Sequence, residues 1–286
     1  MQSLGNDFVV IDGIRQSADM SPEIAQRIAD RHTGIGCDQI LIAEIATPAN
    51  GVDFIFRIFN ADGSEVGQCG NGARCIARFL HDEKLSDSDC ITVKTQTALM
   101  QLRCNSDDTI SVNMGVPTFE PDEIPIQAEQ RERTYTLNVA GESIEVCALA
   151  IGNPHAVQIV EDVDLVDVPA KGALIENHSR FPKRVNAGYM QVLSRGAIKL
   201  RVFERGVGET LACGSGACAA AMAGQTLDYL DESVKASLPG GDLQVEWKGE
   251  REPVWLTGPA TTVFKGNITW RINEQVRRGN TNRVER

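Results

Sequence analysis

The chain has 286 residues, of which 42% are hydrophobic, so it can bury a sizeable core in one large domain or in two of ordinary size. Its formal net charge is −11, and it shows no basic face of the kind that binds nucleic acid. It has no run of about 18 apolar residues and no signal-like start, so we expect neither a spanning helix nor secretion.

In chain order, most segments are β-branched runs bounded by turn residues, which predicts strands. These strands are expected over 8–12, 39–45, 52–59, 90–104, 109–115, 134–139, 144–152, 156–161, 189–204, 243–248 and 261–270. Helices are fewer. Ser21 as N-cap, Pro22 and Glu23 predict a helix that runs to about residue 32. Two more are expected over 73–85 and 217–230, and the polar end 271–286 is expected to fray.

Eight cysteines without a secretion signal predict reduced thiols in the cytoplasm. No CxxC pair occurs, so the spacing predicts neither a zinc site nor a thioredoxin-type redox pair, and no metal is expected. Six of the cysteines lie in or near predicted strands and helices and are expected to pack in the core. They are Cys37, Cys75, Cys90, Cys104, Cys147 and Cys218.

The other two cysteines begin matching turns, QCGNGARC at 68–75 and ACGSGAC at 212–218. A constant offset of 144 residues pairs Cys69 with Cys213 and extends to the flanks, where RIFN at 57–60 matches RVFE at 201–204. We therefore predict two similar α+β domains, roughly 5–115 and 152–258, that face each other across a ligand-binding cleft.

A thiol at a helix start has two chemical advantages. The positive end of the helix dipole favours the thiolate, and the free N–H groups of the first turn bind an anion such as a carboxylate. With the two turns face to face, one thiolate removes a proton from a substrate carbon while the opposite thiol protonates its other face. This arrangement inverts the carbon without a cofactor if the helix ends stabilise the carbanion.

The two halves differ at positions that we expect to determine which substrate binds. Asn60 in the first half corresponds to Glu204 in the second, and Arg205 follows. We expect Arg205 to bind a carboxylate and Glu204 to accept a hydrogen bond from an ammonium group.

Six motifs, taken together and in order, resemble the diaminopimelate epimerase family. They are GNDF (5–8), GCDQ (36–39), NADGSEVGQCGNGARC (60–75), GNPH (152–155), RVNAG (184–188) and ERGVGETLACGSGAC (204–218). The resemblance implies cofactor-independent interconversion of LL- and meso-2,6-diaminopimelate, in lysine and peptidoglycan-precursor biosynthesis, by a cytoplasmic homodimer. It implies no nucleic-acid or membrane partner.

The resemblance also implies the fold and the site residues. Each domain should be a mostly antiparallel sheet or barrel around a central helix, with the active site in the cleft between them. The expected division is 1–116, 117–259 and a polar tail 273–286, with a strand at about 260–272 returning to the first domain. Cys69 and Cys213 match the acid–base pair, and His155 and Glu204 match positions that assist it. The substrate-contacting matches are Asn6, Gln39, Asn60, Gly70, Asn71, Asn153, Asn186, Glu204, Arg205, Gly214 and Ser215.

Two departures from the family pattern stand out. Met1-Gln2-Ser3 directly precedes Leu4-Gly5-Asn6, where family chains have a longer lead, so we expect either an internal start or a missing first strand. Phe264 stands where a Tyr is common at the dimer interface, so the contribution of its hydroxyl is lost.

Two alternatives remain open from the sequence. One is a proline or hydroxyproline racemase, which also uses paired cysteines in two similar domains. The other is a thiol redox or ligand-binding protein on the same scaffold, in which the two thiols cycle as a disulfide.

Overall fold

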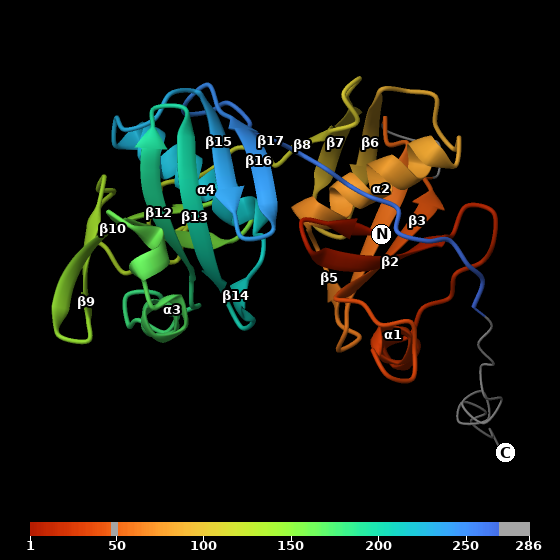
Figure 1. Cartoon of the computed structure of the whole chain (residues 1–286), viewed down its shortest axis with the longest axis horizontal. Helices are drawn as coiled ribbons and strands as arrows, with labels where there is room; N and C mark the ends of the chain where they lie inside the picture. Colours follow the sequence, from red (N-terminus) through yellow and green to blue (C-terminus); the bar gives the residue numbers. More distant parts are fainter. Residues whose placement is uncertain (47–50, 269–286) are drawn as a thin grey trace, which may run out of the picture.

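Two lobes lie side by side, one around helix α2 and the other around helix α4 (Figure 1). The structure is a computed structural model and describes residues 1–46 and 51–268. The N-terminal lobe contains β1 (Gln2–Ser3), β2 (Asn6–Asp12), α1 (Pro22–Ala29), β3 (Gln39–Ile45), β4 (Phe54–Asn60), β5 (Glu65–Val66), α2 (Gly70–Asp82), β6 (Cys90–Lys94), β7 (Leu99–Cys104) and β8 (Ile110–Asn113).

The second lobe repeats this order of elements after the hairpin of β9 (Tyr135–Val139) and β10 (Glu142–Ala150). It continues with β11 (Pro154–Ile159), the 3₁₀ turn η1 (Val163–Leu165), α3 (Val168–Glu176), β12 (Asn186–Ser194), β13 (Ala197–Glu204), β14 (Gly208–Thr210), α4 (Gly214–Thr226), β15 (Ser233–Leu238), β16 (Gly241–Glu246) and β17 (Trp255–Gly258). The predicted α+β fold is confirmed.

Strand pairing shows the repeat most clearly. β2–β3 and β11–β12 pair in parallel, and the next pairs, β3–β4 and β12–β13, are antiparallel. The parallel pair β4–β6 has its counterpart in β13–β15. The last strands of the two lobes, β8 and β17, pair antiparallel with each other, so a continuous ladder joins the lobes.

A duplicated ion pair marks the same repeat. Arg57 binds Glu65 through two N–H···O bonds of 2.9 and 3.0 Å, and Arg201 binds Glu209 through two of 2.6 and 3.0 Å. Each pair connects a long strand to the short strand that leads into a cysteine turn.

Both central helices are mostly buried, although for different reasons. α2 is amphipathic and packs Ala73, Ile76 and Leu80 inside its lobe. α4 is rich in alanine and buried on nearly every face, because small side chains let strands approach it from several sides. Among the described residues, none of the helices is long and apolar enough to cross a membrane.

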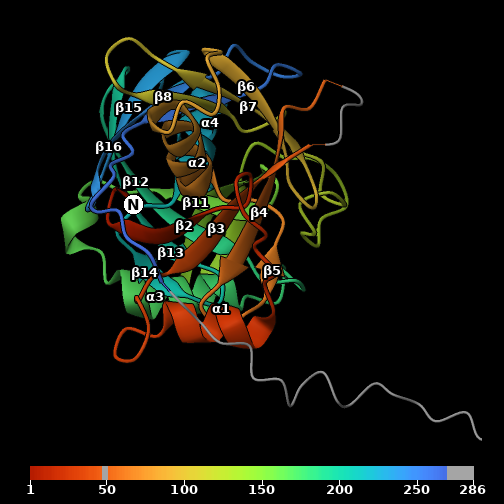
Figure 2. The ribbon, with the colours of Figure 1, turned by 90° about the vertical axis from the view of Figure 1, so that its right-hand side faces the viewer.

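The outer helices α1 and α3 lie at one end of the molecule, one under each lobe (Figures 1 and 2). α1 confirms the predicted helix start, since the Ser21 side chain accepts from the Ile24 N–H, but the helix ends at Ala29. α3 was not predicted. Its signals are an Asp167 N-cap and a Pro in the first turn, at the place in the repeat that α1 occupies.

At the start of the chain the first strand is short but present, since β1 pairs with β2. The strand expected at about 260–272 is reduced, within the described part, to one bridge between Thr261 and Gln2. The segment nevertheless returns to the N-terminal lobe, where Lys265 pairs with Glu83. It lies on the surface with Phe264 exposed, so it buries no face that would hold a strand in register. Residues 269–272 and the tail 273–286 lie outside the described residues.

Leu256 of β17 sits where the two central helices begin. It is fully buried, and its Cδ2 lies 3.7 and 2.9 Å from where a Cβ on Gly70 and on Gly214 would be. We expect Leu256→Ala to lower the free energy of unfolding by about 2–5 kcal/mol and to speed alkylation of both Cys69 and Cys213. Denaturant unfolding and peptide-resolved alkylation measure the two effects.

Leu137→Ala is the matched control, because Leu137 is equally buried but belongs to a separate core cluster in the C-terminal lobe. It should destabilise the protein by a similar amount and leave the reactivity of both thiols unchanged. Equal effects of both variants on the thiols would show that Leu256 has no special place at the helix starts.

Candidate active site

Cys69 is the N-cap of α2, and its side chain turns back onto the helix. Its Sγ accepts from the Gly72 N–H at 3.3 Å. Burial is the largest influence and raises the pKa of the Cys69 thiol to about 11; the Gly72 N–H and the nearby Arg74 oppose this, whereas Glu204 adds to it. The thiol is therefore protonated at neutral pH in the unliganded protein.

Cys213 occupies the same position on α4. Its Sγ accepts from the Gly216 N–H at 3.4 Å and lies 3.6 Å from the Ser215 hydroxyl. Burial raises its pKa well above the usual value, and Glu204 raises it further, both by charge and as a hydrogen-bond acceptor. The two thiols thus have the same local geometry, as the repeat predicted.

The two helix starts meet at the junction of the lobes. The Asn71 Nδ2 donates across this junction to the carbonyl oxygen of Ala212 at 3.2 Å, directly before Cys213. Leu256 contacts both first turns, and Glu204 acts on both thiols. These contacts bring Cys69, Gly70 and Asn71 together with Cys213, Gly214 and Ser215. The first-turn N–H groups have no carbonyl partner within their helices and so can bind an anion.

A pair of reciprocal contacts closes the junction. Gly5 has φ +86°, and Leu211 Cδ1 lies 2.7 Å from where its Cβ would be. Gly152 has φ +75°, and the Gln68 Oε1 lies 2.5 Å from the equivalent point. In both cases a side chain just before a thiol fills the space beside a glycine of the opposite lobe. Any side chain on either glycine would be strained and would push the lobes apart.

Polar side chains line the strand ends of the N-terminal lobe. Gln39 and Asn60 face each other across β3 and β4, and the Gln39 Nε2 donates to the Asn60 Oδ1 at 2.8 Å. The Gln39 Oε1 is buried without a partner among the described residues. Asn6 accepts from the Asn71 amide at 3.4 Å and donates to Asp38. Asn6 is thus linked to the helix start, and Gln39 and Asn60 to each other.

The C-terminal lobe places a matching set at its own strand ends. His155 of β11 pairs in register with Asn186 of β12, and Glu204 ends β13. The Asn186 Oδ1 accepts from the Arg205 backbone N–H at 2.8 Å, and Glu204 accepts from the Thr210 hydroxyl at 2.5 Å. The Arg205 guanidinium instead donates to the Lys183 carbonyl at the surface, so in this structure it does not reach into the junction.

His155 is fully buried and neutral. Its pKa is lowered to about 3, mainly by burial and to a smaller extent by the nearby Arg205. Its Nε2 lies 3.0 Å from the Asn153 Oδ1, which can only accept, so Nε2 carries the proton. A neutral imidazole of this kind can orient Asn153 but does not supply a positive charge.

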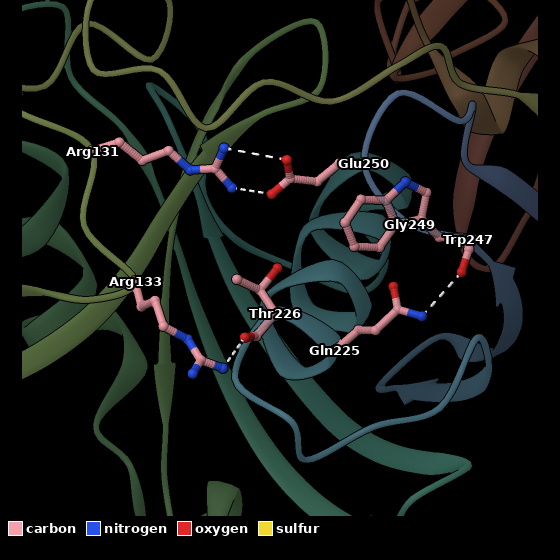
Figure 3. A pocket seen from close by; sticks show the side chains of 7 residues that line it. All are labelled: Arg131, Arg133, Gln225, Thr226, Trp247, Gly249 and Glu250. Carbon is pink, nitrogen blue, oxygen red and sulfur yellow. Dashed lines mark hydrogen bonds and ion pairs between the residues drawn. The ribbon is translucent and has the colours of Figure 1, made fainter.

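A hollow elsewhere in the structure is lined by the seven residues drawn in Figure 3. It has a volume of about 380 Å³ and lies at the far end of α4, where Gln225 and Thr226 end the helix. Its two arginines already have partners, since Arg131 pairs with Glu250, and Arg133 donates to Thr226 O and to Asp228. Because the arginines of this hollow are already paired and the hollow lies at the opposite end of α4 from Cys213, the junction between the helix starts is the better candidate for the active site.

All eight cysteines are free thiols. The inner Cys75 and Cys218 are fully buried, as predicted for packing residues, but Cys90 is exposed because it lies at the start of β6, on the face of the strand that alternates away from the buried Ile91 and Val93. Sequence analysis missed Gln68, Leu211 and Arg74 as parts of the site. The only sequence feature that marks these three residues is their place inside the two cysteine motifs. That place does not show which residues of the opposite lobe they contact.

The profile of the family described as diaminopimelate epimerase matches residues 1–120 and 147–263. Proteins of that name are 53% identical over 268 residues in Nitrosospira multiformis, covering 94% of this chain and 96% of the relative, and 54% identical over 271 residues in Nitrosomonas eutropha, covering 94% and 97%.

Solved structures show the same fold at low identity. A probable proline racemase from Agrobacterium radiobacter with bound carbonate matches with a TM-score of 0.66 at 15% identity, over 94% of this chain and 92% of that one. A hydroxyproline epimerase from Agrobacterium vitis matches at 0.62 and 15%, over 90% and 87%. A phenazine biosynthesis protein from Bacillus anthracis matches at 0.64 and 14%, over 91% and 92%.

The buried neutral His155 predicts an acid sensitivity of the fold. The unfolded chain binds a proton at this imidazole below about pH 6.5, whereas the folded protein does so only near pH 3. Stability is therefore lost as the pH falls through this window, by up to about 1.4 kcal/mol per pH unit from this group. Relative to wild type, His155→Gln should lose less stability between pH 6.5 and 4 in denaturant unfolding.

His81→Gln serves as the control, because His81 is exposed on α2. Its unfolding curve should follow wild type at every pH. If His155→Gln shows the same loss per pH unit as wild type, His155 is protonated in the folded state and the burial argument is wrong.

Proposed function

The chain belongs to the diaminopimelate epimerase family, and we propose that it inverts the α-carbon of LL- and meso-2,6-diaminopimelate between Cys69 and Cys213. The observation that carries this mechanism is the meeting of two thiol-capped helix starts at one junction, with Asn71 bonded across it to the residue before Cys213. The enzyme is an isomerase.

The proposed reaction needs two protons to move and no other chemistry. The substrate carboxylate binds to the first-turn N–H groups of α2 and α4, which places its α-carbon between the sulfurs. One thiolate takes the α-proton and becomes a thiol, and the opposite thiol gives its proton to the other face and becomes the thiolate. The same N–H groups stabilise the charge that develops on the carboxylate.

Burial favours this chemistry even though it raises the pKa of both thiols. A thiol with a raised pKa gives a stronger base once it is ionised, and a strong base is needed to remove a weakly acidic α-proton. The matched caps make either thiol competent as base, so the reaction can run in both directions.

The polar strand ends are proposed to recognise the rest of the substrate. Glu204 lies close enough to act on both thiols and is suited to bind the ammonium group of the reacting centre. We propose that Asn6, Gln39, Asn60, Asn153 and Asn186 bind the distal amino-acid end, with Arg205 turning in from the Lys183 carbonyl to bind the distal carboxylate. The unpartnered Gln39 Oε1 provides a buried acceptor for a ligand N–H.

The sequence relatives decide against proline-type racemisation as the main activity. Relatives above 50% identity over 94% of the chain are named diaminopimelate epimerase, whereas the racemase structures share the fold at about 15% identity. A redox role also fits poorly. Redox-active thiols usually have lowered pKa values, and burial raises the pKa of Cys69 and Cys213.

We further propose that the enzyme works without a cofactor in the cytoplasm, in lysine and peptidoglycan-precursor biosynthesis. Cell fractionation with activity measurement tests the location, and activity that survives exhaustive dialysis against chelator tests the independence from metals. Membrane-bound activity, or activity lost on dialysis and restored by a metal, would contradict these two proposals.

The thiol mechanism predicts that neither cysteine can be replaced alone. Cys69→Ala and Cys213→Ala should each lower kcat for diaminopimelate epimerisation by at least about 10³-fold, because one face of the carbon loses its acid or base. Chiral chromatography of the products measures this, and L-proline in the same assay tests the alternative substrate.

Cys90→Ala is the control, since Cys90 is an exposed thiol at the start of β6, outside both cysteine turns. It should keep wild-type activity. Near-normal inversion by either Cys69→Ala or Cys213→Ala would rule out the two-base mechanism.

We propose a homodimer that uses the surface around Phe264, where the side chains of Val263 and Phe264 are about two-thirds exposed. Two neighbouring exposed apolar side chains on a returning segment favour burial against a partner. Phe264→Asp should weaken dimerisation at least tenfold in analytical ultracentrifugation. Leu165→Asp, at an exposed apolar residue of the other lobe, is the control and should leave the dimer unchanged. An unchanged dimer in Phe264→Asp would place the interface elsewhere.

A further inference from the structure

Arg74 lies in the second turn of α2, and its guanidinium is completely buried. It donates to the Ser3 hydroxyl at 2.8 Å, to the Asn71 Oδ1 at 2.7 Å, to the Pro259 carbonyl at 3.4 Å and to the Gly70 carbonyl at 3.5 Å. All four acceptors are neutral. Within the described ranges, no carboxylate lies within ion-pair distance of it.

A buried cation without a counter-ion is costly, and a core position rarely keeps one. Burial lowers the pKa of Arg74 to about 10, so the guanidinium stays charged at neutral pH. The repeat allows a comparison with the other lobe. The equivalent position on α4, 144 residues later, is the neutral Cys218, which is buried to the same degree. The two lobes therefore differ by one buried positive charge beside the helix starts.

The guanidinium also sets the orientation of Asn71. Because Arg74 donates to the Asn71 Oδ1, the amide must direct its Nδ2 outward, where it donates to the Ala212 carbonyl at 3.2 Å and to the Asn6 Oδ1 at 3.4 Å. The direct hydrogen bond between the two helix starts thus depends on a side chain one turn behind them.

The charges around the two thiols are unequal as a result. Glu204 of β13 disfavours ionisation of both thiols. At Cys69, the Gly72 N–H and the Arg74 charge favour ionisation, whereas at Cys213 the Ser215 hydroxyl and the Gly216 N–H do so. His155 of β11 is neutral and does not restore the balance.

We propose that Arg74 is a positioning residue of this site: it fixes Asn71 across the junction of the helix starts, and its charge makes Cys69 rather than Cys213 the thiol that ionises first. The inference rests on the proposed two-thiol mechanism. When substrate is bound, Cys69 is then the first of the two thiols to lose its proton and acts as the base, and Cys213 holds the proton that is delivered to the opposite face.

Peptide-resolved iodoacetamide alkylation between pH 8 and 12.5, without substrate, tests this assignment in wild type, Arg74→Met, Arg74→Lys and Arg78→Met. In wild type, Cys69 should have the lower pH midpoint. Arg74→Met should raise the Cys69 midpoint by about one unit, a tenfold smaller thiolate fraction, and leave the Cys213 midpoint unchanged. Arg74→Lys keeps the charge and should keep the order, while kcat falls because the Asn71 bond is lost.

Arg78→Met is the matched control, one turn further along α2 and paired with Asp82 and Asp108. It should change neither midpoint. An earlier midpoint at Cys213 in wild type would overturn the proposal, as would an Arg74→Met variant that shifts both midpoints equally or neither. The wild-type order decides the matter even if Arg74→Met fails to fold.

The thiol midpoints are measured without turnover, so they separate this inference from the proposed function. If the single cysteine variants kept their activity, the two-base mechanism would fail whatever the order of ionisation. If those variants were inactive but Cys213 ionised first, only the role of Arg74 would fail.

Discussion

Two helix N-termini, one from each lobe, meet across a single junction, and the rest of the structure depends on holding them there. Positive helix ends repel each other, and their free N–H groups need partners. The fold offsets this cost in three ways. Leu256 packs against both first turns, the paired strands β8 and β17 tie the lobes together behind them, and Asn71 bonds directly across. The first-turn N–H groups that remain free are the ones that we propose to bind the substrate carboxylate between the two thiols.

The duplicated fold explains why the thiols are alike, and its broken symmetry explains how they differ. The repeat gives each lobe the same strand pairing, the same ion pair before the cysteine turn and the same cap geometry. The differences lie at single positions, where Glu204 replaces Asn60 and Cys218 replaces Arg74. A reversible epimerase needs both properties. Its two thiols must exchange the roles of acid and base, so they must be alike. They act on two different faces of the substrate carbon, so they must also differ.

Much of this could be predicted from the sequence because the signals were local or repeated. The constant offset of 144 residues identified the duplication, and the glycines after Cys69 and Cys213 identified helix starts. The contacts between lobes could not be predicted, because a side chain such as Gln68 carries no mark of the glycine it meets at position 152. Arg74 was hidden for a related reason: its burial depends on Ser3 and Pro259, which lie far from it in sequence. The helix α3 was missed although the repeat placed α1 at the same point.

The central claim, that two thiols act on opposite faces of one carbon, is tested most directly by the first turnover in heavy water. With one pure stereoisomer of diaminopimelate as substrate, mass spectrometry of both isomers early in the reaction should find one solvent deuterium in every product molecule and almost none in the remaining substrate. Substrate hydrogen retained in the product would show that a single base serves both faces, and would contradict the account.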